Sequence, residues 1–176
     1  SHTLVHKWRS EEQAIMVGTN TAHLDNPQLN VREWSGKDPL RIVLDNTLRL
    51  SKNLHLFDRS IPTIVFTSCE NQSKVNQPLA EKPQKNLEYI NINFEKNIIP
   101  QISEELYKRE IQSVIIEGGA ELLNSFIKTD IWDEMRVFIG NKIFGNGIKA
   151  PGLPAPFSPQ SRPAHKNSNI EFKKED

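Results

Sequence analysis

The chain has 176 residues, its 22 Lys and Arg balance its 22 Asp and Glu, and it contains one cysteine. This length suits one domain with a substantial core, and the balanced charge gives no electrostatic argument for nucleic acid or a membrane as a partner. The single cysteine excludes an internal disulfide and an all-cysteine zinc site, so we expect a reducing, cytoplasmic location.

The two ends of the sequence resemble interior parts of a domain. Residues 1–9 have the composition of the middle of a helix, and residues 171–176 are typical of a strand that has been cut short. We therefore expect residues 1–176 to form a single domain that is truncated at both ends. No apolar run approaches the length of a membrane span, and no signal peptide is visible.

Six apolar, β-rich runs recur along the chain, with helical or polar segments between them. Their continuous apolar character is typical of strands that are covered on both faces. A helix is expected over residues 98–109, because Ile98, Ile102 and Leu106 share one face. This alternation predicts an α/β fold with a mostly parallel central sheet flanked by helices. The expected strands are Ala14–Val17, Leu40–Leu44, 63–66, 87–92, Val114–Ile116 and 136–139.

Two segments are expected to be irregular surface loops. Residues 69–86 are polar and contain Pro78 and Pro83, and residues 150–163 carry five prolines, which resist regular structure. A proline-rich ligand motif for another protein is the alternative interpretation.

The most informative short stretch is Glu117-Gly118-Gly119, which follows the strand expected at Val114–Ile116. Apolar residues at 122, 123, 126 and 127 then predict a helix. A strand that breaks at two glycines and turns into a helix presents free N–H groups and a helix dipole, and both favour an anion. The stretch therefore predicts a site for a phosphorylated cofactor or substrate, with Glu117 beside it. The alternative is a tight turn alone, because the full dinucleotide fingerprint and a Walker-type lysine are absent.

A second polar region spans residues 9–32. There the strand Ala14–Val17 leads into a turn expected at residues 18–21. Small polar side chains after a strand leave room for a ligand and supply hydrogen bonds. Arg9 and Arg32 flank this region and are candidates to bind one phosphate together. Taken singly, each arginine is expected to be a solvated surface charge.

The histidines and the cysteine predict no further chemistry. His2 and His6 have i,i+4 spacing, but no further ligand accompanies them, so no metal site is predicted. Cys69 has no evident base partner and is interpreted as structural. No Gly-x-Ser-x-Gly nucleophile motif occurs.

Four stretches, taken in order, resemble a known family. The chain is similar to the reductase half of the bifunctional riboflavin-biosynthesis deaminase/reductase. The stretches are residues 17–32 (VGTNTAHLDNPQLNVR), 39–45 (PLRIVLD), 116–123 (IEGGAELL) and 132–139 (WDEMRVFI).

This resemblance implies a dihydrofolate reductase-like fold, a homodimer, and NADPH-dependent reduction of 5-amino-6-(5-phosphoribosylamino)uracil to its ribitylamino product. The deaminase half of that family carries His-x-Glu and Pro-Cys-x-x-Cys zinc signatures, and neither occurs here. We therefore expect the deaminase domain to be a partner from the same full-length chain.

The resemblance also implies roles for individual residues. It places Arg9, Leu29 and Arg32 around the ribose phosphate of the substrate. Glu117 falls beside the reacting ribose as the catalytic residue, where it either handles a proton or orients ribose hydroxyls. Residues 119–125 are implied to wrap the cofactor pyrophosphate. The cofactor-binding residues are Thr21, Asp25, Asn46, Gly118, Gly119, Ala120, Glu121, Leu122 and Leu123.

The family's first strand, with a lysine and a Ser-x-Asp-Gly turn near the site, is missing from this sequence. Preference for NADP over NAD needs a polar or basic site for the 2′-phosphate, and the candidates are Thr67, Ser68, Arg49 and Lys74.

Two alternative functions remain: another reductase of the same fold that acts on a pyrimidine or pteridine, and a non-catalytic nucleotide-binding module. The paired arginines favour a phosphorylated substrate over a folate.

Overall fold

The computed structural model of the chain describes residues 2–68, 85–139, 147, 151 and 169–174. It divides into two compact units, Ser1–Gly119 and Ala120–Asp176, and each is described by itself. The sequence-based expectation of one domain therefore stays a prediction. None of the helices within these described residues is long and apolar enough to cross a membrane.

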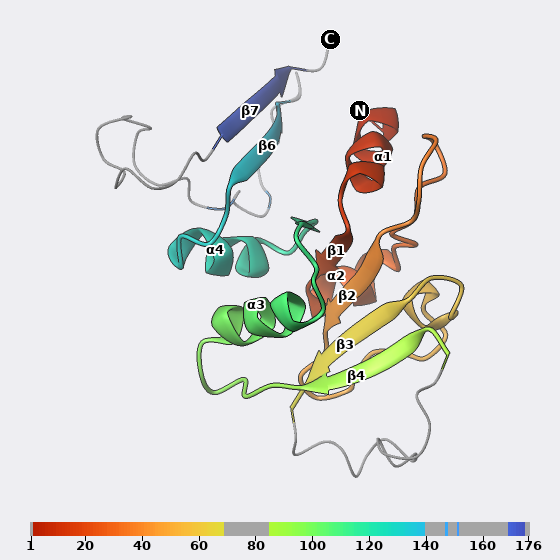
Figure 1. Ribbon diagram of the computed structural model, residues 1–176, viewed down its shortest axis with the longest axis vertical. Helices are drawn as coiled ribbons and strands as arrows, with labels where there is room; N and C mark the ends of the chain where they lie inside the picture. The colour runs from red at the N-terminus through yellow and green to blue at the C-terminus, as the bar shows by residue number, and fades with distance from the viewer. Residues whose placement is uncertain (1, 69–84, 140–146, 148–150, 152–168, 175–176) are drawn as a thin grey trace. The chain divides into compact units, whose positions relative to one another are not determined.

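The first unit is built on a five-stranded sheet in which every strand pair is parallel. The order across the sheet is β4-β3-β2-β1-β5 (Figure 1). The predicted strands of this unit are confirmed, although the third is one residue longer and the fourth one residue shorter than expected. The strands are β1 (Ala14–Val17), β2 (Leu40–Leu44), β3 (Thr63–Thr67), β4 (Leu87–Asn91) and β5 (Val114–Ile116).

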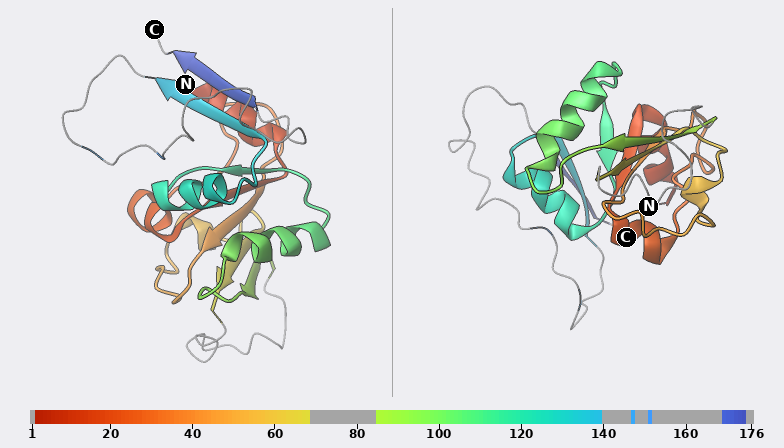
Figure 2. Two further views of the ribbon diagram at one scale, coloured as in Figure 1. Left: turned by 90° about the vertical axis from the view of Figure 1, so that its left-hand side faces the viewer. Right: turned by 90° about the horizontal axis from the view of Figure 1, so that it is seen from below.

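Helices cover this sheet, as the alternating sequence pattern predicts. Figures 1 and 2 agree in placing α2 and α3 on opposite faces of the sheet. The helix expected over residues 98–109 is confirmed, although it ends at Lys108 and buries Ile99 rather than Ile98. Asn97 caps it by accepting a hydrogen bond from the Ile99 N–H at 3.1 Å. The helices are α1 (His2–Glu11), α2 (Thr19–Asp25) and α3 (Ile98–Lys108), with a 3₁₀ turn η1 (His55–Phe57).

The core lies on both faces of the central strands. All residues of β1 and β3 are buried, because both faces of these strands are covered. On one face, Ile15, Val17, Val43 and Val65 form a cluster with Ala22 of α2. The buried side of α3 consists of Ile99, Ile102 and Leu106.

The connections create a switch point at β1. The chain moves outward from β1 through β2 and β3 to β4, and α3 then carries it back to β5 on the other side of β1. Open parallel sheets bind ligands beyond the carboxyl ends of the strands where the order reverses. The ends of β1 and β5 are therefore the expected place for a site.

One sequence expectation is wrong: residues 18–21 do not form a simple turn. Gly18 is the N-cap of α2, and the Ala22 N–H donates to the Gly18 carbonyl at 3.0 Å. The hydroxyl of Thr19 donates to the Leu44 carbonyl at 2.5 Å, which fastens the helix to β2. The sequence does not predict this helix because its residues are mostly polar. Tertiary packing through the buried Ala22, rather than intrinsic helix propensity, stabilises it.

The second unit contains α4 (Ala120–Lys128), β6 (Glu134–Ile139) and β7 (Asn169–Lys174), and its two strands pair in parallel. The helix expected after the glycine pair is confirmed. Strand β6 begins two residues before the expected start, and β7 confirms extended structure near the end of the chain. Residues 69–84, with Cys69 and Lys74, lie outside the described residues, as does nearly all of the expected loop at 150–163.

Candidate active site

Glu117 is fixed at the carboxyl end of β5. Its backbone N–H donates to the Met16 carbonyl at 2.9 Å, so the pairing with β1 continues one residue beyond the strand. The chain then turns at Gly118 and Gly119, whose φ angles are +96° and +83°. Only glycine adopts this backbone region without strain. The polar side chain predicted to carry the chemistry therefore sits at the β1/β5 switch point.

Gly118 also allows a close approach between β5 and α2. A Cβ atom built at Gly118 would lie 3.3 Å from the Thr21 Cγ2 atom. The structure thus brings together two residues that the sequence predicts to bind the cofactor. Asp25 lies four residues beyond Thr21 on α2, hence on the same side of that helix, and it is exposed.

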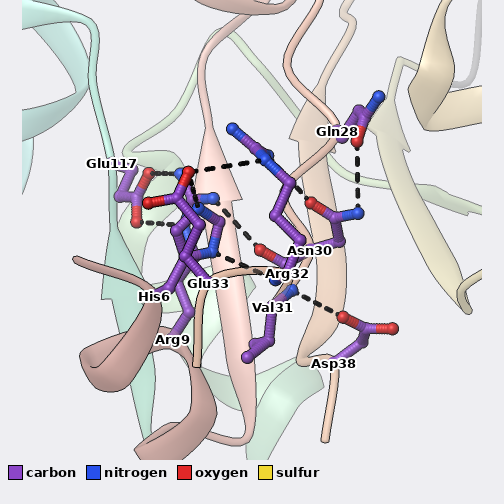
Figure 3. A network of polar contacts seen from close by, with 9 residues as sticks. All are labelled: His6, Arg9, Gln28, Asn30, Val31, Arg32, Glu33, Asp38 and Glu117. Carbon is purple, nitrogen blue, oxygen red and sulfur yellow. Dashed lines mark hydrogen bonds and ion pairs between the residues drawn. The ribbon is translucent and has the colours of Figure 1, made fainter. Parts of the chain in front are cut away.

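The carboxylate of Glu117 is bound by Arg9 of α1. The Arg9 Nε donates to Glu117 Oε1 at 2.7 Å, and Arg9 Nη2 donates to Oε2 at 2.6 Å. Figure 3 shows the two side chains pointing toward one another. This bidentate geometry fixes the plane of the carboxylate and is stronger than a single hydrogen bond.

Asn30 lies between the two predicted phosphate-binding arginines. Its backbone carbonyl accepts a hydrogen bond from Arg9 Nη1 at 3.2 Å, and its side-chain oxygen accepts one from Arg32 Nη1 at 3.1 Å (Figure 3). Arg9 and Arg32 are thus neighbours in space, as the joint assignment required. The role of Asn30 was missed, because no sequence signal marks one asparagine among several as a bridge.

The segment that carries Arg32 is anchored along its length. Leu29 is buried in the core cluster and has a positive φ of 50°, which is rare for a side chain of this size. The Val31 N–H donates to Asp38 Oδ1 at 2.7 Å, and the Arg32 N–H donates to His6 Nδ1 at 3.4 Å. The side chain of Arg32 remains 51% exposed. The backbone is held, and the half-exposed guanidinium lies beside the Glu33 carboxylate, with 3.9 Å between Nε and Oε1.

His6 is buried in the middle of these charges. Burial lowers its pKa from the usual 6.5, and the positive charges of Arg9 and Arg32 lower it further. The carboxylate of Glu33, 3.8 Å from His6 Nε2, and a backbone hydrogen bond with Asn30 oppose that shift. His6 is therefore neutral at neutral pH, and its Nδ1 atom acts as an acceptor.

Asn46 follows β2 and joins the ends of two neighbouring strands. Its carbonyl accepts hydrogen bonds from the Thr67 hydroxyl at 3.1 Å and from the Ser68 N–H at 3.2 Å. Arg49 lies nearby on the same turn, and its Nη2 atom donates to the Asn20 side chain of α2 at 2.7 Å. The structure thus gathers several candidate cofactor residues at the carboxyl ends of β2 and β3.

The remaining predicted cofactor residues belong to the second unit, where they form the start of α4. They are Ala120, Glu121, Leu122 and Leu123. Their contact with a cofactor stays a prediction. Among the residues that the structure describes, no group of three or more His, Cys, Asp or Glu side chains is placed to hold a metal ion.

The chain is similar to proteins of one known family. The family described as RibD C-terminal domain matches residues 1–171. The chain belongs to this family. It is 36% identical over 155 residues to the riboflavin biosynthesis protein RibD of Aquifex aeolicus. The aligned residues make up 87% of this chain and 42% of that protein. It is 30% identical over 138 residues to the 2,5-diamino-6-ribosylamino-4(3H)-pyrimidinone 5′-phosphate reductase of the same organism, covering 78% and 60%.

Solved structures agree with this assignment. A deaminase/5-amino-6-(5-phosphoribosylamino)uracil reductase from Thermotoga maritima matches with a TM-score of 0.58 and 29% identity, over 72% of this chain and 33% of that one. The riboflavin biosynthesis reductase Rib7 of Saccharomyces cerevisiae matches with a TM-score of 0.54 and 25% identity, over 74% and 59%. The predicted dihydrofolate reductase-like α/β fold is confirmed. This RibD C-terminal domain spans less than two thirds of the length of each of these four proteins.

Proposed function

We propose that this chain reduces the ribosyl group of 5-amino-6-(5-phosphoribosylamino)uracil to the ribitylamino product, with NADPH as the hydride donor. The observation that carries the proposal is the group formed by Arg9, Arg32 and Glu117 at the β1/β5 switch point. This group suits a phosphorylated sugar, because Arg32 can bind the phosphate, Arg9 adds positive charge nearby, and the carboxylate accepts hydroxyl hydrogen bonds. The names of the relatives support this substrate class.

The residues divide the work on the substrate. Arg32, with its exposed guanidinium on an anchored backbone, binds the ribose phosphate. Arg9 holds the Glu117 carboxylate in one orientation and contributes positive charge. Glu117 then faces the ribose, where its carboxylate exchanges a proton as the ring opens or positions the hydroxyls. These contacts hold C1′ in place for reduction.

A bound nicotinamide cofactor would supply the hydride for C1′ of the ring-opened substrate, with a proton needed to complete the reduction. The chain fits such a cofactor at the end of β5. A side chain at Gly118 would press against Thr21, and the positive φ angles of the glycine pair give a backbone path that other residues rarely adopt. The residues of the first unit that would hold the cofactor are Thr21, Asp25, Asn46, Gly118 and Gly119.

The turn after β2 supports NADPH over NADH. In dinucleotide-binding sheets an acidic residue binds the ribose 2′-hydroxyl of NAD, whereas an arginine accommodates the 2′-phosphate of NADP. Here the acid at the end of β2, Asp45, is buried, and its carboxylate accepts the N–H groups of Arg49 and Leu50 at 3.0 and 3.1 Å. Arg49 is exposed instead, and Asn20 steadies its guanidinium.

Fluorescence titration tests the cofactor. We expect tighter binding of NADPH than of NADH, and Arg49→Ala should weaken NADPH binding while NADH binding stays the same. Lys96→Ala, which removes an exposed cation between β4 and α3, is the matched control. Equal affinities of the unmodified protein for the two cofactors contradict the proposal.

A coupled assay tests the reaction itself. NADPH oxidation is followed with 5-amino-6-(5-phosphoribosylamino)uracil, with its dephosphorylated form, and with dihydrofolate. Turnover of the phosphorylated substrate alone supports the proposal. Turnover of dihydrofolate indicates the other reductase class, and cofactor binding without any turnover indicates a nucleotide-binding module.

The source of the substrate follows from the same proposal. The Thermotoga maritima relative carries a deaminase name beside its reductase name, and this chain covers 33% of it. We propose that a deaminase domain in the same full-length chain supplies the substrate. A homodimer and a cytoplasmic location stay predictions, which sedimentation of the full-length protein and cell fractionation test.

A further inference from the structure

The segment that presents Arg32 is held from α1 by a residue without an assigned role. His6 and Arg9 lie three residues apart and therefore share one face of α1. Both side chains face the segment around Asn30, as Figure 3 shows. Arg9 binds the Asn30 carbonyl, and His6 Nδ1 accepts the Arg32 N–H two residues later.

The contact depends on which ring nitrogen of His6 carries the proton. A neutral imidazole accepts a hydrogen bond at Nδ1 only when its proton is on Nε2. The Nε2 atom points toward the Glu33 carboxylate at 3.8 Å, which suits that tautomer. Because His6 is 2% exposed, water does not replace the contact with Arg32 if it is lost.

The charged groups around His6 oppose its protonation. The cations that face it are Arg9, from its own helix, and Arg32, from the segment packed against that helix, and the facing anion is Glu33. Farther out, Glu117 binds Arg9 and Asp38 binds the Val31 N–H. Burial and the two cations outweigh the anion and the backbone hydrogen bond with Asn30, both of which favour the charged ring, so the pKa of His6 lies below its usual value. A proton on Nδ1 would turn this atom into a donor that faces the N–H donor of Arg32, so the hydrogen bond between them would be lost.

We propose that His6 is a positioning residue for the substrate phosphate: its neutral ring holds the Arg32 backbone so that the guanidinium faces the ligand, and protonation of His6 releases Arg32. This inference rests on the proposed function of Arg32. It predicts that phosphate affinity, rather than the rate of the chemical step, depends on His6.

Two substitutions separate positioning from folding. His6→Leu removes the acceptor, whereas His6→Asn keeps a side-chain oxygen close to the position of Nδ1. We expect His6→Leu to raise the KM for the phosphorylated substrate and the Kd for ribose 5-phosphate about tenfold, the effect of one lost hydrogen bond. The kcat and the Kd for NADPH should stay within about twofold of the unmodified protein, which also shows that the variant is folded. His2→Leu, which makes the same replacement at an exposed histidine of the same helix, is the matched control.

The pH dependence of ribose 5-phosphate binding distinguishes positioning from a purely structural role of His6. The ratio of ribose 5-phosphate Kd values for the unmodified protein and His6→Asn is measured by calorimetry across pH 5 to 8, a range of about three units around the usual histidine pKa. Ionisation of the ligand cancels in this ratio. We expect the ratio to be constant near neutral pH and to rise below about pH 6.5, because only the unmodified protein has a side chain to protonate.

Three results overturn the inference: an unchanged Kd in His6→Leu, an equal loss in His6→Asn, or a ratio that is independent of pH. The titration with ribose 5-phosphate also separates this inference from the proposed function. Ribose 5-phosphate binding that follows these expectations in a protein without reductase turnover leaves His6 in its role and rejects the reaction. Reductase turnover without ribose 5-phosphate binding rejects the role of His6.

Discussion

The first unit contains two arginine–carboxylate pairs that differ in purpose. Arg41 of β2 is 2% exposed, and its Nη1 atom binds Asp58 Oδ1 at 3.0 Å and the His55 carbonyl at 3.1 Å. Asp58 Oδ1 also accepts the N–H and hydroxyl of Ser60 at 2.8 and 2.7 Å. Arg9 and Glu117 form a closer, bidentate pair at 2.7 and 2.6 Å, and the neighbouring Arg32 is half-exposed.

The comparison shows that position along the sheet, rather than burial, separates a structural ion pair from a candidate site. Arg41 is the second residue of β2, and its partner lies 17 residues away on a local turn. Glu117 lies just beyond the carboxyl end of β5, and its partner is 108 residues away. Open sheets bind ligands at that end. Four predictions test this distinction.

The largest expected effect is on stability, at Arg41. Arg41→Ala leaves a cavity at one of the largest fully buried side chains and removes the partner of Asp58. We expect the free energy of unfolding to fall by about 3–5 kcal/mol, measured by urea denaturation. Arg9→Ala should cost about 1–2 kcal/mol, because solvent can reach its half-buried partner. A larger loss for Arg9→Ala than for Arg41→Ala would contradict the distinction.

The next effect is on catalysis, at Glu117. Glu117→Gln keeps the shape of the side chain and an acceptor for Arg9, but it removes the charge and the exchangeable proton. We expect turnover to fall about 10²-fold or more, the scale of a lost general acid or base, with NADPH affinity nearly intact. Normal turnover together with a lower melting temperature would show that Glu117 only supports the fold.

Substrate affinity should respond to Arg32. Arg32→Ala removes a charge-assisted contact to the phosphate, so we expect substrate binding to weaken by about 1.5–3 kcal/mol. Calorimetry with the substrate and with NADPH separates the two sites, and Lys37→Ala provides a control at an exposed cation nearby. Loss of NADPH binding instead would move Arg32 to the cofactor site.

The sequence predicts the sheet far better than it predicts the site. The bounds of β1, β2 and β5 match the expected runs residue for residue. The reason is plainest for β1, which is buried throughout and therefore needs a continuous apolar sequence. The helix α2 was missed because seven residues are too few for propensity to reveal a helix. The local sequence pattern therefore predicts elements that are buried, and it misses elements that depend on a tertiary contact.

The site shows the same limit. The sequence nominates Arg9, Glu117 and Arg32 individually, yet it gives no sign that Arg9 and Glu117 bind each other across 108 positions. Asn30 and His6 have ordinary sequence surroundings. Their roles arise from a segment whose path depends on the positive φ of Leu29 and on contacts with α1. Residue type predicts chemistry, whereas the pairing of side chains requires the fold.

The smallest expected effect is the pH dependence of stability, and it distinguishes the two regions. Burial raises the pKa of Asp58, but hydrogen bonds from Ser60 and the charge of Arg41 outweigh it and hold that pKa below its usual 3.8. The stabilisation from Asp58 is therefore complete above its usual pKa and is lost as pH falls toward the folded value. Because the carboxyl is 37% exposed, the loss should be under about 1 kcal/mol.

His6 acts in a different pH window. Its pKa in the folded protein is below the usual 6.5, so the unfolded chain binds more protons between the two values and stability falls as pH decreases through that window. Urea midpoints across the pH range should decline below about pH 6.5 in the unmodified protein and less steeply in His6→Asn. In Asp58→Asn the decline through this window should persist, and the further decline below about pH 4 should shrink. A decline near pH 6 that survives His6→Asn would place the responsible group outside the candidate site.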